Sequence, residues 1–306
     1  MAGEILITGE NSGRTFRQGE KIGSGQHGYV FRAKESEKTY ALKQPIPYSP
    51  TIDILRKEGA IHNELDHKHI APVVLFDAYT NESGTEIPFI VTPLAQTDLQ
   101  TYLDKRGPLP PEQAFELSEQ IAGALDAIHK KEVIFSDIKP SNILLYKGLD
   151  TVVHGKITDF GGAVHTYFPT GEYPWASPAY AAPEASLKVS ELTPAADQYG
   201  WVMGVVYPSL IGKSPLEEID SSSDKQSLPV FRTLLANHMT QLHEAFEPVV
   251  TRASQQNPKE RYTSMEELLD DLNSRKAKTK EQQSKQLRTL SYLFLSSLHA
   301  PQYLIQ

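Results

Sequence analysis

Three stretches of this sequence, read in order along the chain, decide its fold: GSGQHGYV at residues 23–30, FSDIKPSN at 135–142 and TDFGG at 158–162. The first is rich in glycine and runs directly into β-like sequence. The second places a lysine two residues after an aspartate, and the third places another aspartate before Phe-Gly. Each stretch alone is weak evidence, whereas the ordered set supplies a phosphate-covering loop, a lysine and two carboxylates.

The glycine-rich stretch fits a strand-loop-strand turn better than a dinucleotide-binding turn. In a dinucleotide-binding fold the Gly-x-Gly-x-x-Gly pattern opens a helix, but here Gly28 is followed at once by the strand-forming residues YVF. The backbone at Gly23, Gly25 and Gly28 can lie close over phosphates because no side chain intervenes. An ordinary glycine-containing hairpin is the alternative for this stretch by itself.

The composition is that of an ordinary globular protein. Among 306 residues, 39% are hydrophobic and 22% are charged, which allows a sizeable core and excludes a disordered or fibrous chain. The formal net charge of -8 argues against a nucleic-acid partner, because backbone binding depends on Lys and Arg. Cysteine is absent, which excludes disulfides and thiolate sites and favours a reducing, cytoplasmic location. No apolar run approaches the roughly 20 residues of a membrane-spanning helix, so stable membrane insertion is not expected.

Residues 15–91 carry short β-like patterns and one helical stretch. The segments YVF and TYALK, the latter at 39–43, flank a polar turn, which predicts a hairpin. The helical stretch covers 52–65, and FIV at 89–91 returns to strand character. A small antiparallel sheet with one main helix is therefore expected, followed by a connecting hinge at 92–98.

Residues 99–275 are mainly helical. Helical patterns cover 112–130, 195–211, 229–254 and 264–272, and an acidic, serine-rich stretch at 217–226 is interpreted as a solvated loop. The apolar residues of the first helix recur on one face: Ala114, Leu117, Ile121, Leu125 and Ile128. The sequence therefore predicts an α+β fold of two lobes, a small antiparallel β lobe with one main helix and a larger, mainly α lobe.

A tail at 276–306 differs from the domain predicted at 1–275. It starts with basic residues and then places apolar residues near one helical face, at Leu287, Leu290, Phe294 and Leu298. We interpret it as a basic segment followed by an amphipathic helix. Docking on the large lobe of the same chain is favoured over a homodimer or partner contact, and both are favoured over a membrane surface.

The stretch FSDIKPSN resembles the catalytic loop of protein kinases, and together with the other two stretches it makes the chain similar to eukaryotic-type (Hanks-type) serine/threonine protein kinases. The segments DQY and NPKERYTSMEELLDDL look most like the bacterial branch of that family. The resemblance covers about 15–272 and implies a bilobal protein-kinase-like fold.

The resemblance implies a role for each polar residue of the second and third stretches. Asp137 would act as the catalytic base, orienting the substrate hydroxyl and accepting its proton, while Lys139 neutralises charge on the transferred phosphoryl group. Asn142 and Asp159 would bind Mg²⁺. The physical logic agrees, because phosphoryl transfer requires mainly alignment and charge neutralisation. A turn-forming aspartate is the alternative for Asp137 alone.

Lys43, at the end of YALK, would hold an ammonium group where it can pair with the α- and β-phosphates of ATP. Its partner carboxylate would come from the following helix, which offers Glu58 and Glu64. We choose Glu58 because it stands nine residues before His67, which matches the family spacing. A surface lysine and a solvated glutamate are the alternative for such residues in isolation.

ATP and Mg²⁺ are the cofactors that the resemblance implies. Thr92 would be the gatekeeper, the backbone of Pro93 and Ala95 would meet the adenine edge, and Asp98 would hydrogen-bond the ribose. The other predicted ATP-binding residues are Gly23, Ser24, Gly25, Gly28, Val30, Ala41, Lys43, Asn142 and Asp159.

The segment SPAYAAPE at 177–184 resembles the end of a kinase activation segment. The resemblance implies a structural ion pair between Glu184 and Arg261, and an aspartate, Asp197, that braces the catalytic loop. Lys139 and Ser177 together favour serine or threonine hydroxyls of protein substrates, with tyrosine as the alternative.

Two residues of the catalytic motif depart from the family pattern, which usually begins His-Arg. Phe135 could replace the histidine by packing against Phe160. Ser136 cannot bind a phosphorylated residue as the arginine does, which gives the hypothesis of a non-RD enzyme whose activity does not depend on activation-loop phosphorylation at Thr166, Tyr167, Thr170 and Tyr173.

The sequence as a whole predicts an active serine/threonine protein kinase. The same departures make a pseudokinase, a nucleotide-binding scaffold without turnover, the main alternative. A small-molecule phosphotransferase of related fold is a second alternative, and the 177–184 segment counts against it.

Overall fold

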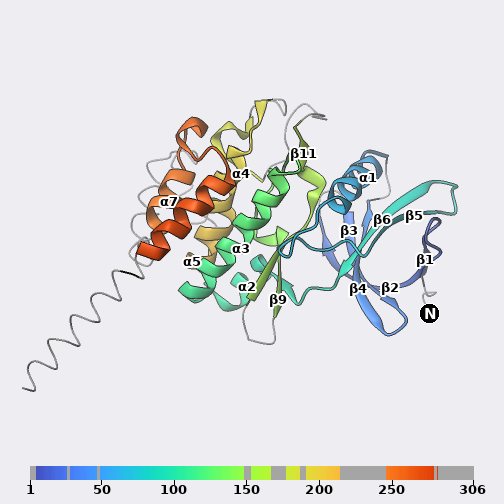
Figure 1. Ribbon diagram of the computed structural model, residues 1–306. Helices are drawn as coiled ribbons and strands as arrows, with labels where there is room; N and C mark the ends of the chain where they lie inside the picture. Colours follow the sequence, from blue (N-terminus) through green and yellow to red (C-terminus); the bar gives the residue numbers. More distant parts are fainter. Residues whose placement is uncertain are drawn as a thin grey trace, which may run out of the picture.

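The computed structural model describes residues 5–25, 28–46, 49–147, 153–166, 177–186, 191–213, 246–278 and 281. Two lobes follow one another along the chain, a β-rich lobe drawn in blue and a helical lobe drawn in green to red (Figure 1). The predicted α+β, two-lobed architecture is confirmed. The stretch predicted as an acidic loop at 217–226 and the apolar face of the tail lie outside the described residues.

The small lobe is built on a six-stranded sheet of order β1-β2-β3-β4-β6-β5, in which every neighbouring pair is antiparallel. Its strands are β1 (Ile5–Thr8), β2 (Thr15–Ser24), β3 (Gly28–Glu35), β4 (Lys38–Pro45), β5 (Leu75–Thr80) and β6 (Glu86–Pro93). The predicted hairpin is β3–β4, whose register ends at Glu35 opposite Lys38. Phe16, Leu42 and Phe89 are fully buried and form the centre of this lobe.

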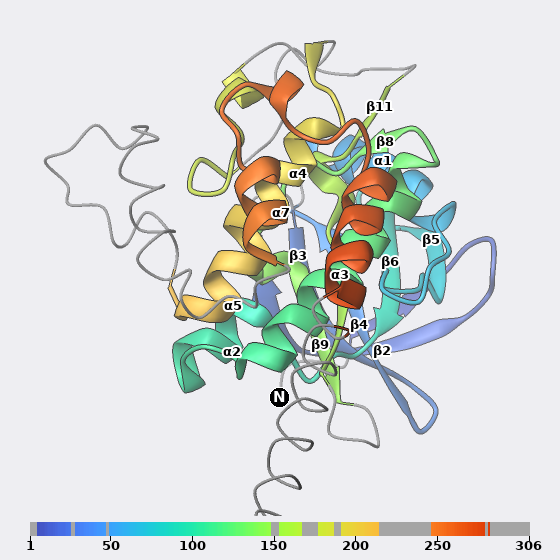
Figure 2. The ribbon, with the colours of Figure 1, turned by 60° about the vertical axis from the view of Figure 1, so that its left-hand side comes forward.

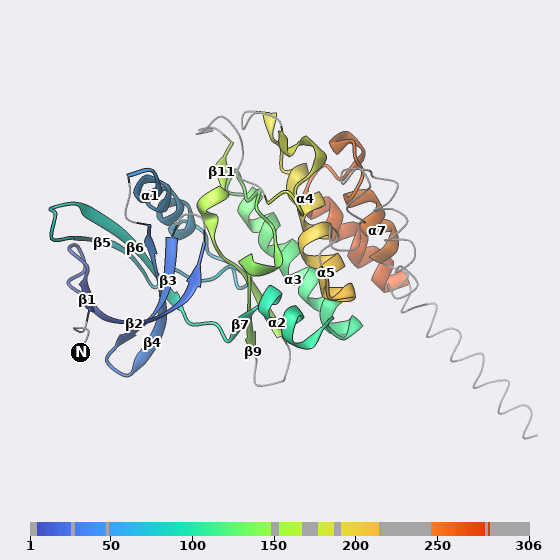
Figure 3. The same cartoon turned by 180° about the vertical axis from the view of Figure 1, so that it is seen from behind.

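Helix α1 (Ser49–Asn63) covers one side of the sheet, as the view from behind shows (Figure 3). It begins three residues before the predicted 52–65, because Pro50 suits a first helical turn. It ends two residues early, where the amides of Glu64 and Leu65 bond three residues back and tighten the chain. A Cβ at Gly59 would lie 2.3 Å from the ring of Phe76, so glycine allows α1 to approach β5 closely.

The large lobe contains α2 (Leu99–Arg106), α3 (Pro111–His129), α4 (Ala195–Trp201), α5 (Tyr207–Ile211) and α7 (Phe246–Ala253), and residues 265–278 are also helical. The predicted apolar face of α3 is confirmed, since all five of its residues are 0% exposed. Figure 2 shows α4, α5 and α7 side by side, with the red helix at 265–278 beside α3. Within the part of the chain described, no helix is both long enough and apolar enough to span a membrane.

Between α4 and α5 the predicted helix at 195–211 passes through a π-helical turn, Val202–Val206. Pro208 explains it, because a proline within a helix cannot donate to the carbonyl four residues back. The turn brings Gly204 so near the carbonyl of Ile138 that an added Cβ would lie 2.4 Å from that oxygen. This helix therefore packs directly beneath the loop that contains Asp137.

Short strands hold two loops of the large lobe. β9 (Ile143–Lys147) lies between β10 (Val153–Ile157) and β7 (Thr97–Asp98), while β8 (Val133–Ile134) pairs with β11 (Val164–His165). Strands β8 and β9 therefore flank the 135–142 loop, and β10 and β11 flank the 158–162 stretch. The two-residue strands were not predicted, because they are too short to show a pattern.

Candidate active site

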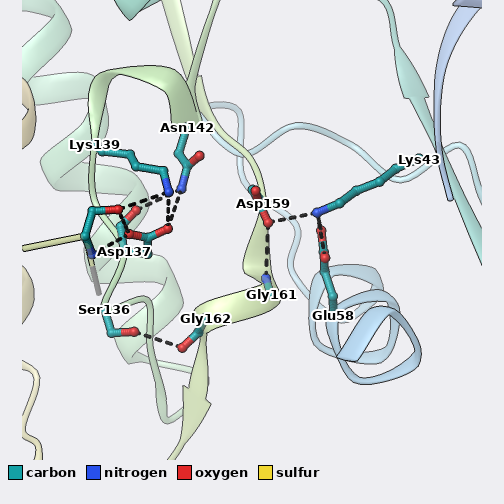
Figure 4. Close-up of polar contacts among 10 residues, drawn as sticks. Lys43, Glu58, Ser136, Asp137, Lys139, Asn142, Asp159, Gly161 and Gly162 are labelled. Carbon is teal, nitrogen blue, oxygen red and sulfur yellow. Dashed lines mark hydrogen bonds and ion pairs between the residues drawn. The ribbon is translucent and has the colours of Figure 1, made fainter. Parts of the chain in front are cut away.

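The three sequence stretches meet at the junction of the two lobes. The glycine-rich turn, β4 and α1 come from the small lobe, and the loops at 135–142 and 158–162 come from the large lobe. Figure 4 shows Lys43 of β4 and Glu58 of α1 on one side, with residues of the loops at 135–142 and 158–162 on the other.

Lys43 joins the lobes through two carboxylates. Its Nζ lies 2.7 Å from both carboxylate oxygens of Glu58 on α1 and 2.8 Å from Oδ1 of Asp159 (Figure 4). Glu58 is 2% exposed, and burial raises the pKa of its carboxyl to about 7 although the charge of Lys43 opposes this. Burial lowers the pKa of Lys43, but the charges of Asp159 and Glu58 outweigh this and raise it above its usual value. The structure thus pairs Lys43 with Glu58, as predicted, rather than with Glu64.

Asp159 holds an unusual backbone conformation. Its φ of 67° lies in the left-handed region, and its Oδ1 accepts a 3.4 Å hydrogen bond from the amide of Gly161. Burial raises the pKa of Asp159, but Lys43 outweighs this and lowers it, which keeps the carboxylate ionised. The side chain is 38% exposed and so remains accessible to a ligand.

Asp137 lies in a polar cluster on the large-lobe side. Its Oδ1 accepts hydrogen bonds from the hydroxyl of Ser177 at 2.8 Å and from the Ser177 amide at 3.0 Å. Its Oδ2 is 2.6 Å from Nζ of Lys139, which also donates to the Ser177 hydroxyl at 3.2 Å. Asn142 donates from Nδ2 to the carbonyl of Asp137 at 2.9 Å. The Asp137 carboxylate therefore already accepts a hydrogen bond from a hydroxyl group, that of Ser177, beside the ammonium group of Lys139.

Asp197 on α4 braces this loop from below, as predicted. Its carboxylate accepts the amides of Phe135 and Ser136, each at 2.8 Å, and lies 2.7 Å from Nε2 of His129. The Asp197 side chain is 0% exposed. Three hydrogen bonds to one buried carboxylate fix the backbone immediately before Asp137.

Phe135 and Ser136 make separate contacts with the loop at 158–162. The ring of Phe135 packs edge-on against Phe160, with centroids 5.1 Å apart and planes at 77°, which confirms the predicted packing. Ser136 has a φ of 60°, and its hydroxyl donates to the carbonyl of Gly162 at 2.8 Å. The serine contact was not predicted, because nothing local in the sequence indicates it.

Asn142 and Asp159 suit a hard cation. The amide of Thr158 donates to the carbonyl of Asn142 at 3.0 Å, which places the two loops side by side. Among the described residues, Oδ1 of Asn142 and Oδ2 of Asp159 receive no hydrogen bond, and both are oxygens of the kind that Mg²⁺ prefers. No cluster of three or more His, Asp or Glu side chains fit for a metal occurs in this part of the chain. Phosphate oxygens and water would have to complete such a site.

The glycine-rich turn belongs to the small lobe and lies beside β4. The amide of Gly25 donates to the carbonyl of Gly28 at 2.9 Å, and an added Cβ at Gly28 would lie 2.4 Å from the Gln44 carbonyl oxygen. Val30 pairs with Lys43 across β3 and β4. The other predicted small-lobe residues lie on the same sheet: Gly23 and Ser24 end β2, and Ala41 on β4 is opposite Thr92 on β6.

The predicted hinge contains two further contacts. The hydroxyl of Tyr146 donates to the carbonyl of Pro93 at 3.1 Å. Asp98 caps α2 by accepting from the amide and hydroxyl of Thr101, at 2.8 and 2.7 Å. Ala95 lies between them. The Asp98 carboxylate thus has a structural role besides any contact with a ligand.

The end of the activation segment is anchored as predicted. Arg261 is 0% exposed at its side chain and pairs with both oxygens of Glu184, at 2.5 and 2.8 Å. At the other end of the segment, Thr166 donates from its amide to the carbonyl of Glu132 at 2.8 Å. The other hydroxyl residues considered for regulation, Tyr167, Thr170 and Tyr173, lie outside the described residues.

Comparison with known proteins agrees with this geometry. A model of the protein kinase domain matches residues 16–272, so the chain belongs to the protein kinase family. It is 31% identical over 215 residues to the Aurora kinase of Schizosaccharomyces pombe, which covers 68% of this chain and 58% of that protein. It is also 27% identical over 274 residues to serine/threonine-protein kinase PknH of Mycobacterium tuberculosis, covering 81% of this chain and 40% of that protein.

A third relative is serine/threonine-protein kinase fused of Drosophila melanogaster, 30% identical over 202 residues, which covers 63% of this chain and 24% of that protein. The chain thus spans between 24% and 58% of the length of these three relatives. The resemblance to Hanks-type serine/threonine kinases, including bacterial ones, is confirmed.

Proposed function

We propose that this chain is a serine/threonine protein kinase that transfers the γ-phosphate of ATP to protein hydroxyls in the presence of Mg²⁺. The observation that carries the proposal is the bridge made by Lys139, whose ammonium contacts both the Asp137 carboxylate and the Ser177 hydroxyl. In this arrangement a hydroxyl group, a base and a compensating cation lie within hydrogen-bond distance of one another. Two of the relatives, fused and PknH, are named serine/threonine-protein kinases, which supports serine or threonine as acceptors.

In the proposed reaction, Asp137 accepts a hydrogen bond from the substrate hydroxyl and orients its oxygen toward the γ-phosphorus. A bond forms between that oxygen and phosphorus, the bond to the β–γ bridging oxygen breaks, and the hydroxyl proton passes to Asp137. Lys139 offsets the charge on the transferred group, and Lys43 holds the α- and β-phosphates. Asn142 and Asp159 would bind Mg²⁺, which supplies charge neutralisation on the phosphates.

The proposed ATP site runs from the glycine-rich turn to the hinge. The backbone at Gly23, Ser24 and Gly25 would cover the phosphates, while Val30 and Ala41 would enclose the adenine. Thr92, Pro93 and Ala95 would line its edge. Asp98 would meet the ribose while still capping α2.

We infer that activity does not require activation-loop phosphorylation, since Ser136 offers no cation for a phosphate. Replacing Thr166, Tyr167, Thr170 and Tyr173 together by alanine tests this. Turnover close to that of the wild type is expected, and a fall to background in a folded protein would contradict it.

The comparisons give no support to the pseudokinase alternative, and the chain carries each polar residue that the proposed reaction uses. The 177–184 segment with its Glu184–Arg261 anchor favours a protein substrate over a small molecule. A cytoplasmic location, the domain boundary at 275/276 and a dimer or partner contact through 276–306 stay predictions. The helix at 265–278 continues across that boundary, and Lys276 pairs with Glu119 on α3.

The decisive experiment is transfer of labelled γ-phosphate from ATP and Mg²⁺ to a generic basic protein and to the chain itself. Wild type is compared with Asp137→Asn, and the modified residue type is identified. Label on serine or threonine in the wild type alone is expected. No label with intact ATP binding would overturn the proposal and favour a scaffold.

A further inference from the structure

His62 is a buried polar residue of α1 that the proposed reaction does not use. It lies one helical turn after Glu58, so both side chains are on the same face of α1. It is 2% exposed, and its Nε2 lies 2.6 Å from the carbonyl oxygen of Ala71. Its ring packs against Phe160, with centroids 4.6 Å apart and planes at 37°.

The hydrogen bond defines the state of the ring. The Ala71 carbonyl can only accept, so Nε2 of His62 must carry the hydrogen and donate it. Burial lowers the pKa of His62 to about 4, in agreement with a neutral ring near pH 7. A neutral imidazole is thus held between a backbone carbonyl and an aromatic ring.

The acceptor is fixed to the strand that leads into the 158–162 loop. The amide of Ala71 donates to the carbonyl of Ile157 at 2.9 Å, and Ile157 ends β10 two residues before Asp159. His62 therefore connects α1 to the strand that leads into Asp159, and by its ring to Phe160, the next residue. Glu58 on the same face makes a second connection, through Lys43 to Asp159.

A hydrogen bond constrains rotation of α1 in a way that apolar packing does not, because the N–H must point at the carbonyl. Rotating α1 so that Glu58 leaves Lys43 would also pull Nε2 away from Ala71 and leave the carbonyl unsatisfied in the interior. The two contacts consequently favour the same orientation of the helix.

We propose that His62 is a positioning residue whose hydrogen bond to the Ala71 carbonyl holds α1 in the orientation that pairs Glu58 with Lys43. This inference rests on the proposed kinase function for its catalytic consequence, but the orientation of α1 can be measured without turnover. His62 touches no reacting atom and acts through Glu58.

The test uses the full chain with three substitutions. His62→Leu keeps an apolar side chain against Phe160 but removes the donor, and His62→Gln restores an N–H within reach of Ala71. His69→Leu is the matched control, because His69 is also buried, at 8% exposure, and its Nδ1 lies 3.0 Å from the Gly155 carbonyl, away from α1. Amide hydrogen exchange in α1 and the kinetic constants for ATP are measured for each.

For His62→Leu we expect exchange in α1 to rise about tenfold, and the KM for ATP to rise severalfold at a smaller change in kcat. In His62→Gln, the exchange rate in α1 and the KM for ATP should both return toward the wild-type values. His69→Leu should lower thermal stability without altering the exchange rate in α1 or the KM for ATP. If His62→Leu kept the wild-type exchange rate in α1 and the wild-type KM for ATP, the proposal would be overturned. If the wild type transfers no phosphate, the proposed function fails, while the exchange in α1 still decides the role of His62.

Discussion

The hydroxyl of Ser136 donates a 2.8 Å hydrogen bond to the carbonyl of Gly162, which joins the residue before Asp137 to the residue after the Asp-Phe-Gly motif. Because Ser136 is held in the left-handed region with a φ of 60°, its side chain reaches across to the neighbouring loop. The contact links the proposed base to the proposed metal-binding loop within the protein itself. No phosphate group is required to make it.

Replacing Ser136 by alanine should therefore impair catalysis without preventing folding. Loss of one partly buried hydrogen bond costs about 1 kcal/mol, which corresponds to a roughly fivefold lower kcat if the loop must be held for turnover. Steady-state kinetics with saturating ATP measure the effect. Ser141→Ala, an exposed serine in the same loop, is the control and should behave as the wild type. Equal kcat for Ser136→Ala and the control would show that this contact does not position the loop.

Lys43→Met should nearly abolish activity. The substitution removes the cation shared by Glu58 and Asp159 and leaves two carboxylates facing each other, so ATP phosphates lose their partner and gain repulsion. We expect kcat/KM for ATP to fall by roughly 100-fold or more. Lys34→Met, an exposed lysine on the adjacent strand β3, controls for the loss of a positive charge. A Lys43→Met protein that retains wild-type kcat/KM would refute the role of this residue.

The sequence predicted the elements whose signals are local. The apolar residues of α3 and of the β3–β4 hairpin recur at fixed periods. The resemblance of the motifs to the kinase family led to Lys43, Glu58 and Asp137 as expected site residues. The contacts of Ser136 with Gly162 and of His62 with Ala71 were missed. They join residues 26 and 9 positions apart and depend on backbone conformation rather than on a repeating pattern. The four-residue spacing from Glu58 was the one available signal that His62 shares its helical face.

Asp77 should make stability depend on pH in acid solution. It is 5% exposed, and burial alone would raise its pKa, but hydrogen bonds from Ser12, Ala78 and Asn11 outweigh burial and lower it to about 2. The folded pKa lies below the unfolded one, so the stabilisation is complete above about pH 5 and is lost as pH falls through 4 toward 2. The contribution is about 2 kcal/mol near pH 7, of which about 1 kcal/mol disappears by pH 3.

Urea unfolding of wild type and Asp77→Asn at several pH values measures this contribution. The difference in unfolding free energy between them should be largest near pH 7 and shrink toward pH 3. Asp53→Asn, whose carboxylate is 71% exposed, should show little difference at any pH. A difference between wild type and Asp77→Asn that does not change with pH would exclude the carboxylate as its source.

Replacing Arg261 tests how strongly its ion pair with Glu184 anchors the end of the activation segment. Its guanidinium makes five hydrogen bonds, two to Glu184 and three to the carbonyls of Ala195, Gln255 and Gln256. In Arg261→Lys the ammonium keeps the charge but cannot satisfy these acceptors together, so buried oxygens lose partners and stability should fall by about 3 kcal/mol.

The matched control for Arg261→Lys is Arg275→Lys, whose ion pair with Asp271 is 37% and 29% exposed at the two side chains and should contribute less than about 1 kcal/mol. Thermal unfolding of both variants gives the comparison. Since Glu184 ends the proposed substrate-positioning segment, Arg261→Lys should also raise the KM for a protein substrate while leaving the KM for ATP unchanged. Equal destabilisation by the two substitutions would mean that the buried pair anchors the segment no better than a surface pair does.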